Sequence, residues 1–142
     1  MNITIIIHEE NLSKIKNLPG NFKKGLTRGL TKAMLFAEAQ AKLRFNTPDN
    51  LHVRTGHLRR SIGSGASGNT GWVGTNVFYG EVNELGMTIR PKKGKYLKFQ
   101  IQGQWKTVKE VVIPPRPFIR PAVEENAIKL GDIIMISVME TI

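Results

Sequence analysis

The sequence predicts a single α+β domain, in which one long helix and a C-terminal helix pack on a mostly antiparallel sheet. A length of 142 residues with 40% hydrophobic residues fits one domain with one modest core. Apolar residues recur every three or four positions between residues 21 and 45 and again after residue 121, which predicts two helices. Residues 96–101 instead alternate between apolar and polar side chains, as in a strand.

The N-terminal third contains a short strand and the clearest helix. The β-branched run from Ile3 to Ile7 is too short for a helix and predicts a strand, and residues 9–18 predict a brief helix. We expect the long helix to run from Asn21, as its cap, to Phe45. Glycines 25 and 29 weaken this helix by about 1 kcal/mol each relative to alanine, so packing must hold it.

The middle of the chain is rich in glycine. Residues 63–68 match the Gly-x-Gly-x-x-Gly pattern of dinucleotide-binding loops, but no helix is predicted directly after them. We therefore interpret them as the tip of a hairpin. Trp72 and Val73 then open a strand, and residues 78–85 predict a short helix that ends at Gly86.

A hairpin and a proline-rich arm precede the last helix. Within a hairpin at about residues 87–113, residues 96–101 and 104–113 are the predicted strands, joined at Gln102-Gly103. The prolines of residues 113–121 predict a stiff, extended arm, with Pro121 in the first turn of the final helix. That helix has more apolar surface than one buried side needs. Its surplus residues either widen the contact with the sheet or meet another copy.

The net charge is +10 and is unevenly distributed. Positions 1–120 are strongly basic, whereas positions 121–142 hold one basic and four acidic residues. A basic body attracts polyanions such as nucleic acid, or an acidic protein surface. The asymmetry also permits head-to-tail contact between copies of the chain.

The sequence predicts no catalytic, cofactor or metal site. There are no cysteines, and the three histidines do not have the spacing of metal ligands or of a catalytic triad. Glu81 and Glu84 lie on a short polar segment and are expected to form salt bridges with the abundant lysines and arginines. The N-terminus lacks the features of a signal peptide and no run predicts a membrane span, so we expect a soluble chain suited to a reducing cytoplasm, with no membrane partner.

Residues 54–62 read Arg-Thr-Gly-His-Leu-Arg-Arg-Ser-Ile. Thr55 can cap one helical turn in which Leu58 and Ile62 are buried and the two arginines, Arg59 and Arg60, stay in solvent. An ordinary junction between a loop and a helix would look the same.

Several stretches together resemble one known family. Residues 54–62 resemble its signature D-T-G-x-L-R-x-S-I, and residues 113–122 are similar to its P-x-R-P-F-L-x-P-A element. Between them, Val-Gly-Thr-Asn, Tyr-Gly and Glu-Leu-Gly at positions 73–86 look like its V-G-T-N, Y-A and E-F-G run. Order and spacing agree over about residues 20–140. The family is that of the small tail-completion or neck proteins of long-tailed bacteriophages. Arg54 departs from its usual aspartate.

The resemblance implies a non-enzymatic structural protein of the head-tail junction, acting as a ring of copies between connector and tail-tube or tail-terminator proteins. It would be found in the virion, and in the host cytoplasm during assembly. Our candidates for the partner interface are Thr55, Leu58, Arg59, Arg60, Arg116, Phe118 and Arg120. We expect Phe118 to be an anchor whose change to alanine leaves a folded domain that assembles poorly. The alternative function is a nucleic-acid-binding module that uses the basic helix and hairpin.

Overall fold

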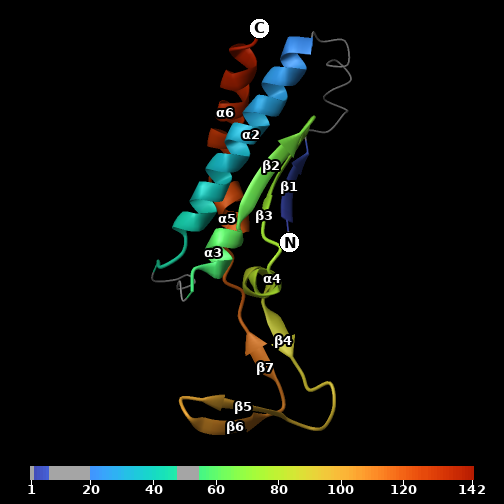
Figure 1. The fold of residues 1–142 in the computed structure, drawn as a ribbon, viewed down its shortest axis with the longest axis vertical. Coiled ribbons are helices and arrows are strands. Elements are labelled where there is room, and N and C mark those ends of the chain that lie inside the picture. The colour runs from blue at the N-terminus through green and yellow to red at the C-terminus, as the bar shows by residue number, and fades with distance from the viewer. Residues whose placement is uncertain (1, 7–19, 48–54) are drawn as a thin grey trace.

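The computed structural model describes residues 2–6, 20–47 and 55–142 of the chain. The fold is elongated, with the long helices at one end of the longest axis and a small hairpin at the other (Figure 1). The helix predicted at residues 9–18 lies outside the described residues.

Helix α2 (Gly20–Leu43) is the central element of the fold. It begins one residue before the predicted cap, so Asn21 lies in its first turn. The sheet formed by the first three strands packs on one side of it and the C-terminal helix on another, which confirms the α+β class (Figure 1). Its buried residues follow the predicted helical spacing and are Gly25, Leu26, Gly29, Leu30, Ala33, Met34, Ala37 and Ala41.

The sheet beside α2 is antiparallel, with the order β1 (Asn2–Ile6), β3 (Thr70–Gly74), β2 (Gly63–Ser67). The glycine-rich stretch is therefore a strand, and only Gly68 and Asn69 form the tip predicted for the whole stretch. Its glycines make room for the indole of Trp72, because a Cβ at Gly65 would lie 2.8 Å from the ring nitrogen Nε1. Close packing against Trp72, rather than a turn, accounts for the glycines of this strand.

Helix α6 (Ala127–Met139) packs along α2 through small residues. A Cβ built on Gly29 would lie 2.9 Å from the Cα atom of Ile134, and one on Gly25 would collide with Thr141. The two glycines therefore let the backbones approach closely. This contact is the packing that the sequence requires for the glycine-containing half of α2.

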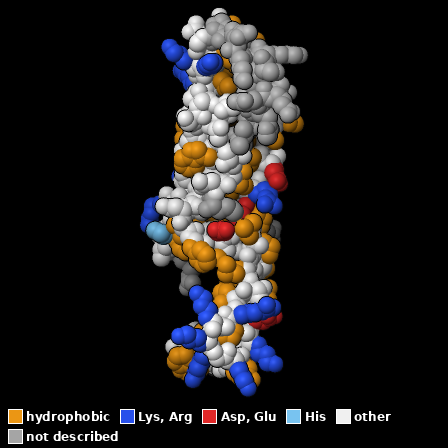
Figure 2. Space-filling view, turned by 90° about the vertical axis from the view of Figure 1, so that its right-hand side faces the viewer, with side chains coloured by type: hydrophobic (Ala, Val, Ile, Leu, Met, Phe, Trp, Pro, Cys, Tyr) orange, Lys and Arg blue, Asp and Glu red, His pale blue; other side chains and the backbone are white. Residues whose placement is uncertain are grey.

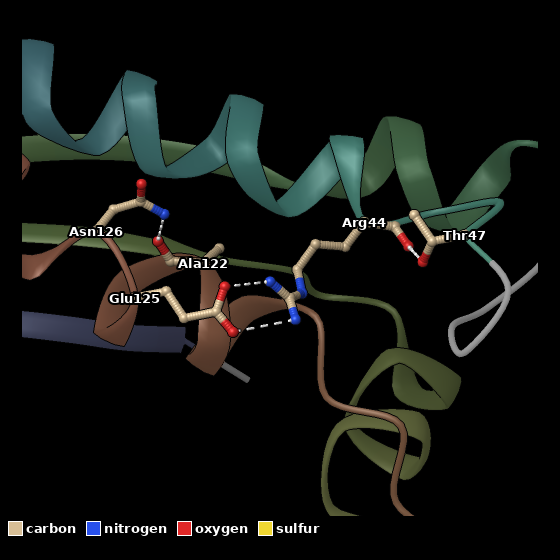
Figure 3. Close-up of polar contacts among 5 residues, drawn as sticks. All are labelled: Arg44, Thr47, Ala122, Glu125 and Asn126. Carbon is tan, nitrogen blue, oxygen red and sulfur yellow. Dashed lines mark hydrogen bonds and ion pairs between the residues drawn. The ribbon is translucent and has the colours of Figure 1, made fainter.

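The final helix is divided in two at Glu125 and Asn126, where a single helix was predicted. Helix α5 (Ile119–Glu124) precedes the break, with Pro121 in its first turn as expected. The Asn126 amide donates to the carbonyl of Ala122 at 2.9 Å. Figure 3 shows the Arg44 guanidinium, at the end of α2, reaching the Glu125 carboxylate with N···O distances of 2.8 and 3.4 Å. The break thus joins the end of α2 to the end of α5.

Two short helices, α3 (His57–Ser61) and α4 (Phe78–Leu85), connect the sheet to the rest of the chain. Both lie where the sequence predicted helical turns, and α4 ends at Gly86.

Residues 87–113, called the projection from here on, extend away from the helices (Figure 1). Strand β4 (Met87–Ile89) pairs with β7 (Val111–Ile113), and β5 (Leu97–Ile101) pairs with β6 (Gln104–Val108). The prediction of one continuous strand over 104–113 was wrong, because the chain changes partners at Lys109 and Glu110. The predicted arm is also shorter than expected, since α5 begins at Ile119.

The main core lies where α2, α3, α5, α6 and the sheet meet, and the projection contributes nothing to it. Its buried members are Ala33, Met34, Ala37, Ala41, Phe45, Leu58, Ile62, Val73, Phe118, Ile119, Ala122 and Leu130.

Candidate functional site

The two motif segments, far apart in sequence, meet in the core beside the base of the projection. Leu58 from α3 and Phe118 just before α5 belong to the same buried cluster. The Phe118 ring is only 1% exposed and meets Phe45 edge-on, with ring centroids 5.2 Å apart. Phe118 therefore contacts its own chain. The prediction that it reaches a partner is wrong for this structure, because its surface is already covered.

Glu84 of α4 binds the start of α5 with its carboxylate. One oxygen accepts the backbone N–H groups of Phe118 at 2.7 Å and Ile119 at 3.0 Å, and the other accepts that of Arg120 at 2.7 Å. The side chain is only 4% exposed. The first N–H groups of a helix have no partner within the helix and carry partial positive charge, so a buried carboxylate is well matched to them.

This role for Glu84 corrects the predicted salt bridge to a lysine or arginine. Sequence reasoning missed it because the bonded groups are 34 to 36 residues apart and no local spacing marks the pair. Glu81, considered with it, is exposed.

The Thr-Gly pair of the first motif sets the start of α3. Gly56 is the residue that precedes the helix and has φ = 74°, a left-handed conformation that glycine adopts without strain. Thr55, the predicted cap, lies one position before the observed cap Gly56, and its hydroxyl accepts the N–H of His57 at 3.3 Å. The capping residue is thus Gly56, with Thr55 supplying the bond. Leu58 and Ile62 are buried and Arg59 and Arg60 exposed, as predicted.

Helix α3 is held to α4 and to the segment just before it by two polar contacts and one close approach. The hydroxyls of Ser61 and Thr75 lie 2.6 Å apart, and His57 Nδ1 lies 2.8 Å from the Tyr79 hydroxyl. A Cβ at Gly80 would lie 2.9 Å from a methyl of Leu58. The Tyr-Gly and Val-Gly-Thr-Asn elements therefore keep α4 against α3.

Both ends of the projection are fixed at α4. The outgoing strand leaves through Gly86 (φ = 74°), where a Cβ would lie 2.9 Å from the carbonyl oxygen of Ile113. On the returning side, the N–H of Arg116 donates to the carbonyl of Asn83 at 2.6 Å, and Glu84 holds the next turn. We call this set of contacts the root of the projection.

The distal part of the projection is strongly basic. Between Arg90 and Glu110 the chain has seven lysines and arginines and a single carboxylate, and that carboxylate pairs with Arg90 at 3.0 Å. Lysine and arginine side chains gather at the lower end of the molecule in Figure 2. Trp105 is 66% exposed, with the ammonium of Lys98 5.3 Å from its ring centroid.

The register of β5 and β6 separates two faces of the hairpin. Residues directly opposite each other point to the same side. Leu97 faces Val108 and Phe99 faces Lys106, so these four side chains share one face with Ile101. Lys98 and Trp105 lie on the other face. The first face is apolar apart from one ammonium group and the amide of Gln104.

The remaining interface candidates, Arg59, Arg60, Arg116 and Arg120, are exposed. Arg60 donates to the carbonyl of Thr55 at 3.3 Å. Among the described residues, no cluster of three histidine, aspartate or glutamate side chains could hold a metal ion. Within the same ranges, no helix is both long and apolar enough to cross a membrane.

Among the carboxyl groups of the described residues, Glu38 on α2 has a clearly shifted pKa. Desolvation raises its pKa, but hydrogen bonds from Lys42 and from Ser64 of β2, together with the charge of Lys42, outweigh this and lower it below the ordinary 4.5. The hydrogen bond from the Ser64 hydroxyl measures 2.6 Å. This group ties α2 to the sheet and lies outside the root.

Comparisons with known proteins were made at three levels. No family model, curated protein or solved structure matches the chain significantly. Function is therefore argued from the motifs and from the geometry that they form.

Proposed function

We propose that the chain is a structural protein of the head-tail junction of a long-tailed bacteriophage, acting by oligomerisation and by docking between the connector and the tail. Glu84, Gly86 and Arg116 hold the root. Thr55, Leu58 and Phe118 fix α3 and the start of α5 beside it, and the projection and the exposed arginines make the contacts.

One observation carries the proposal. The motif stretches that resemble the tail-completion family, though spread over more than sixty positions, meet around α3, α4, the start of α5 and the root. Here Gly56 starts α3, Gly80 packs on Leu58, Glu84 binds α5 and Gly86 opens the projection.

The shape and chemistry of the chain support a role in assembly. The projection lies away from the core, and its hairpin is a two-stranded unit of the kind that is marginally stable without a partner. Such a hairpin gains stability when it docks on the surface of another protein.

Depletion of the chain in a host that produces the phage tests the proposal. We expect filled heads and complete tails that stay unattached, counted by electron microscopy. Labelled antibody against the chain should bind intact virions where head meets tail. Attached, infectious particles without the chain would refute the proposal.

The alternative, a nucleic-acid-binding module, is favoured by the lysines and exposed aromatics of the projection. The basic residues of α2 also line a shallow open depression formed by Lys23, Lys24, Thr27, Arg28 and Thr31. Binding of this kind depends steeply on salt. Tight binding of duplex or single-stranded DNA at physiological ionic strength, with normal particles after depletion, would favour this alternative.

A further inference from the structure

Two apolar surfaces, one on the hairpin and one on α6, are incompletely covered within the described residues; on the hairpin Ile101 is exposed, while Leu97, Phe99 and Val108 are half-buried. The first is the hairpin face, defined by Leu97, Phe99, Ile101, Lys106 and Val108. The second is the outer side of α6, where Ile128, Asp132, Met135 and Met139 follow one another at spacings of four, three and four and so share one side. We call these four residues the α6 stripe.

The α6 stripe is turned away from the core. Ile128 is 85%, Met135 61% and Met139 67% exposed, whereas Leu130 and Val138, on the other side of the helix, are buried against α2. Isolated exposed apolar residues are ordinary, but a continuous stripe of them marks an interaction surface. The methionines make such a surface adaptable in shape.

The hairpin face needs a cover for the same reason. A two-stranded hairpin is stable in water only when it packs against something else. None of its residues belongs to the core clusters, and Ile101 is 45% exposed. Nucleic acid would satisfy the lysines of the projection but would leave Ile101 and the exposed parts of Leu97 and Phe99 without an apolar cover, so an apolar protein surface fits this face better.

The two surfaces match in size and charge. From Ile128 to Met139 the helix rises about 17 Å, and β5 extends about 13 Å. Each surface carries one charge within its apolar residues, the Lys106 ammonium on the hairpin and the Asp132 carboxylate on α6. The surrounding segments also differ in sign, since positions 90–110 are basic and positions 121–142 acidic.

We propose that the hairpin face of one copy docks on the α6 stripe of a second copy, with Lys106 facing Asp132. Figure 1 places β5 and β6 at one end of the molecule and α6 toward the other, so the contact joins different copies. Because it links two different surfaces, it can repeat from copy to copy and close into a ring. Its role in the virion rests on the function proposed above, whereas the contact itself is tested by mass in solution.

Charge reversal tests the pairing. In Lys106→Glu the altered hairpin meets a carboxylate, and in Asp132→Lys two ammonium groups meet. Each variant alone should self-associate at least about tenfold more weakly than wild type, because like charges in an apolar contact are costly. A mixture of the two variants places opposite charges at every contact and should regain association, measured by light scattering or analytical ultracentrifugation.

Matched controls separate this contact from a general charge effect. Lys98→Glu makes the same charge change as Lys106→Glu, but on the other face of the hairpin. Glu124→Lys makes the same charge change as Asp132→Lys, but at an exposed position of α5. Both should associate like wild type, and association should survive salt that releases DNA.

Two results would overturn the inference. One is a wild-type chain that stays monomeric at every concentration reached. The other is equal weakening by Lys98→Glu and Lys106→Glu, which would indicate a diffuse polyanion-binding surface. Neither result alone would decide the head-tail function, because the depletion experiment does not depend on self-association of the isolated chain.

Discussion

Phe118 and Glu84 hold the same turn of chain, one by its ring and the other by its carboxylate. The ring packs edge-on against Phe45 within the main core, while the carboxylate satisfies backbone N–H groups that would otherwise be buried without acceptors. Apolar packing and backbone hydrogen bonding thus fix one short segment, and removal of either should be costly.

Phe118→Ala should lower the free energy of unfolding by about 3–5 kcal/mol, because it leaves a cavity in the core. Urea unfolding followed by circular dichroism measures this. Phe99→Ala on the projection is the matched control and should change the free energy of unfolding by less than about 1 kcal/mol. Equal effects of the two changes would contradict the assignment of Phe118 to the core.

Glu84→Gln keeps the size of the side chain but turns an N–H₂ group toward backbone donors. A hydrogen bond to a charged group contributes about 1.5–3 kcal/mol, and we expect a loss in that range in the same urea experiment. Glu81→Gln on the exposed side of α4 should be nearly neutral. If both variants unfold like wild type, the carboxylate does not hold α5.

Glu38 should make stability depend on pH in the acid range. Its pKa in the folded chain is lower than the ordinary 4.5, so its contribution is present above 4.5 and is lost as pH falls through the folded-state pKa. Glu38→Gln should therefore be less stable than wild type at pH 7, with a difference that shrinks below pH 4.5. Exposed Glu124→Gln serves as control, and a constant difference across this range would contradict the prediction.

At the scale of elements, the projection is separable from the body. Ile89 and Val111 are opposite each other in β4 and β7, so a two-residue Asn-Gly turn can replace residues 90–110. We expect the shortened chain to unfold with nearly the same free energy as wild type, since the removed residues lie outside the core. It should no longer self-associate. A collapse of stability on excision would show that the hairpin supports the body.

Most element types were predictable because the helices and the β5 strand carry clear periodicity. The glycine-rich strand β2 was not predictable from its own residues. Its glycines are explained by the close approach of Trp72 on the neighbouring strand, not by a local preference for a strand. The change of partner between β6 and β7 was missed because β-branched residues flank Lys109 and Glu110 on both sides, which favours a strand before and after them. Phe118 was located correctly by its motif but was assigned to a partner, because sequence alone does not distinguish a residue buried in its own fold from one buried in an interface.

At the scale of the whole molecule, the charge changes sign along the long axis of the fold. The basic hairpin is at one end, and α6, in the acidic C-terminal segment, lies toward the other. Such a polar molecule orients its neighbours, because like ends repel and unlike ends attract before any apolar contact forms. The burial of apolar surface then determines how long the contact lasts.

The root also determines how the chain bears a mechanical load. A partner that pulls on the hairpin draws β4 and β7 in the same direction, so the hydrogen bonds between these strands carry little of the force. The load reaches the body at Gly86 on one strand and at residues 115–120 on the other. There the N–H of Arg116 is bound to Asn83, and Glu84 is bound through three hydrogen bonds. Tension on the projection is therefore transmitted to α4 and the core instead of unzipping the strands one bond at a time.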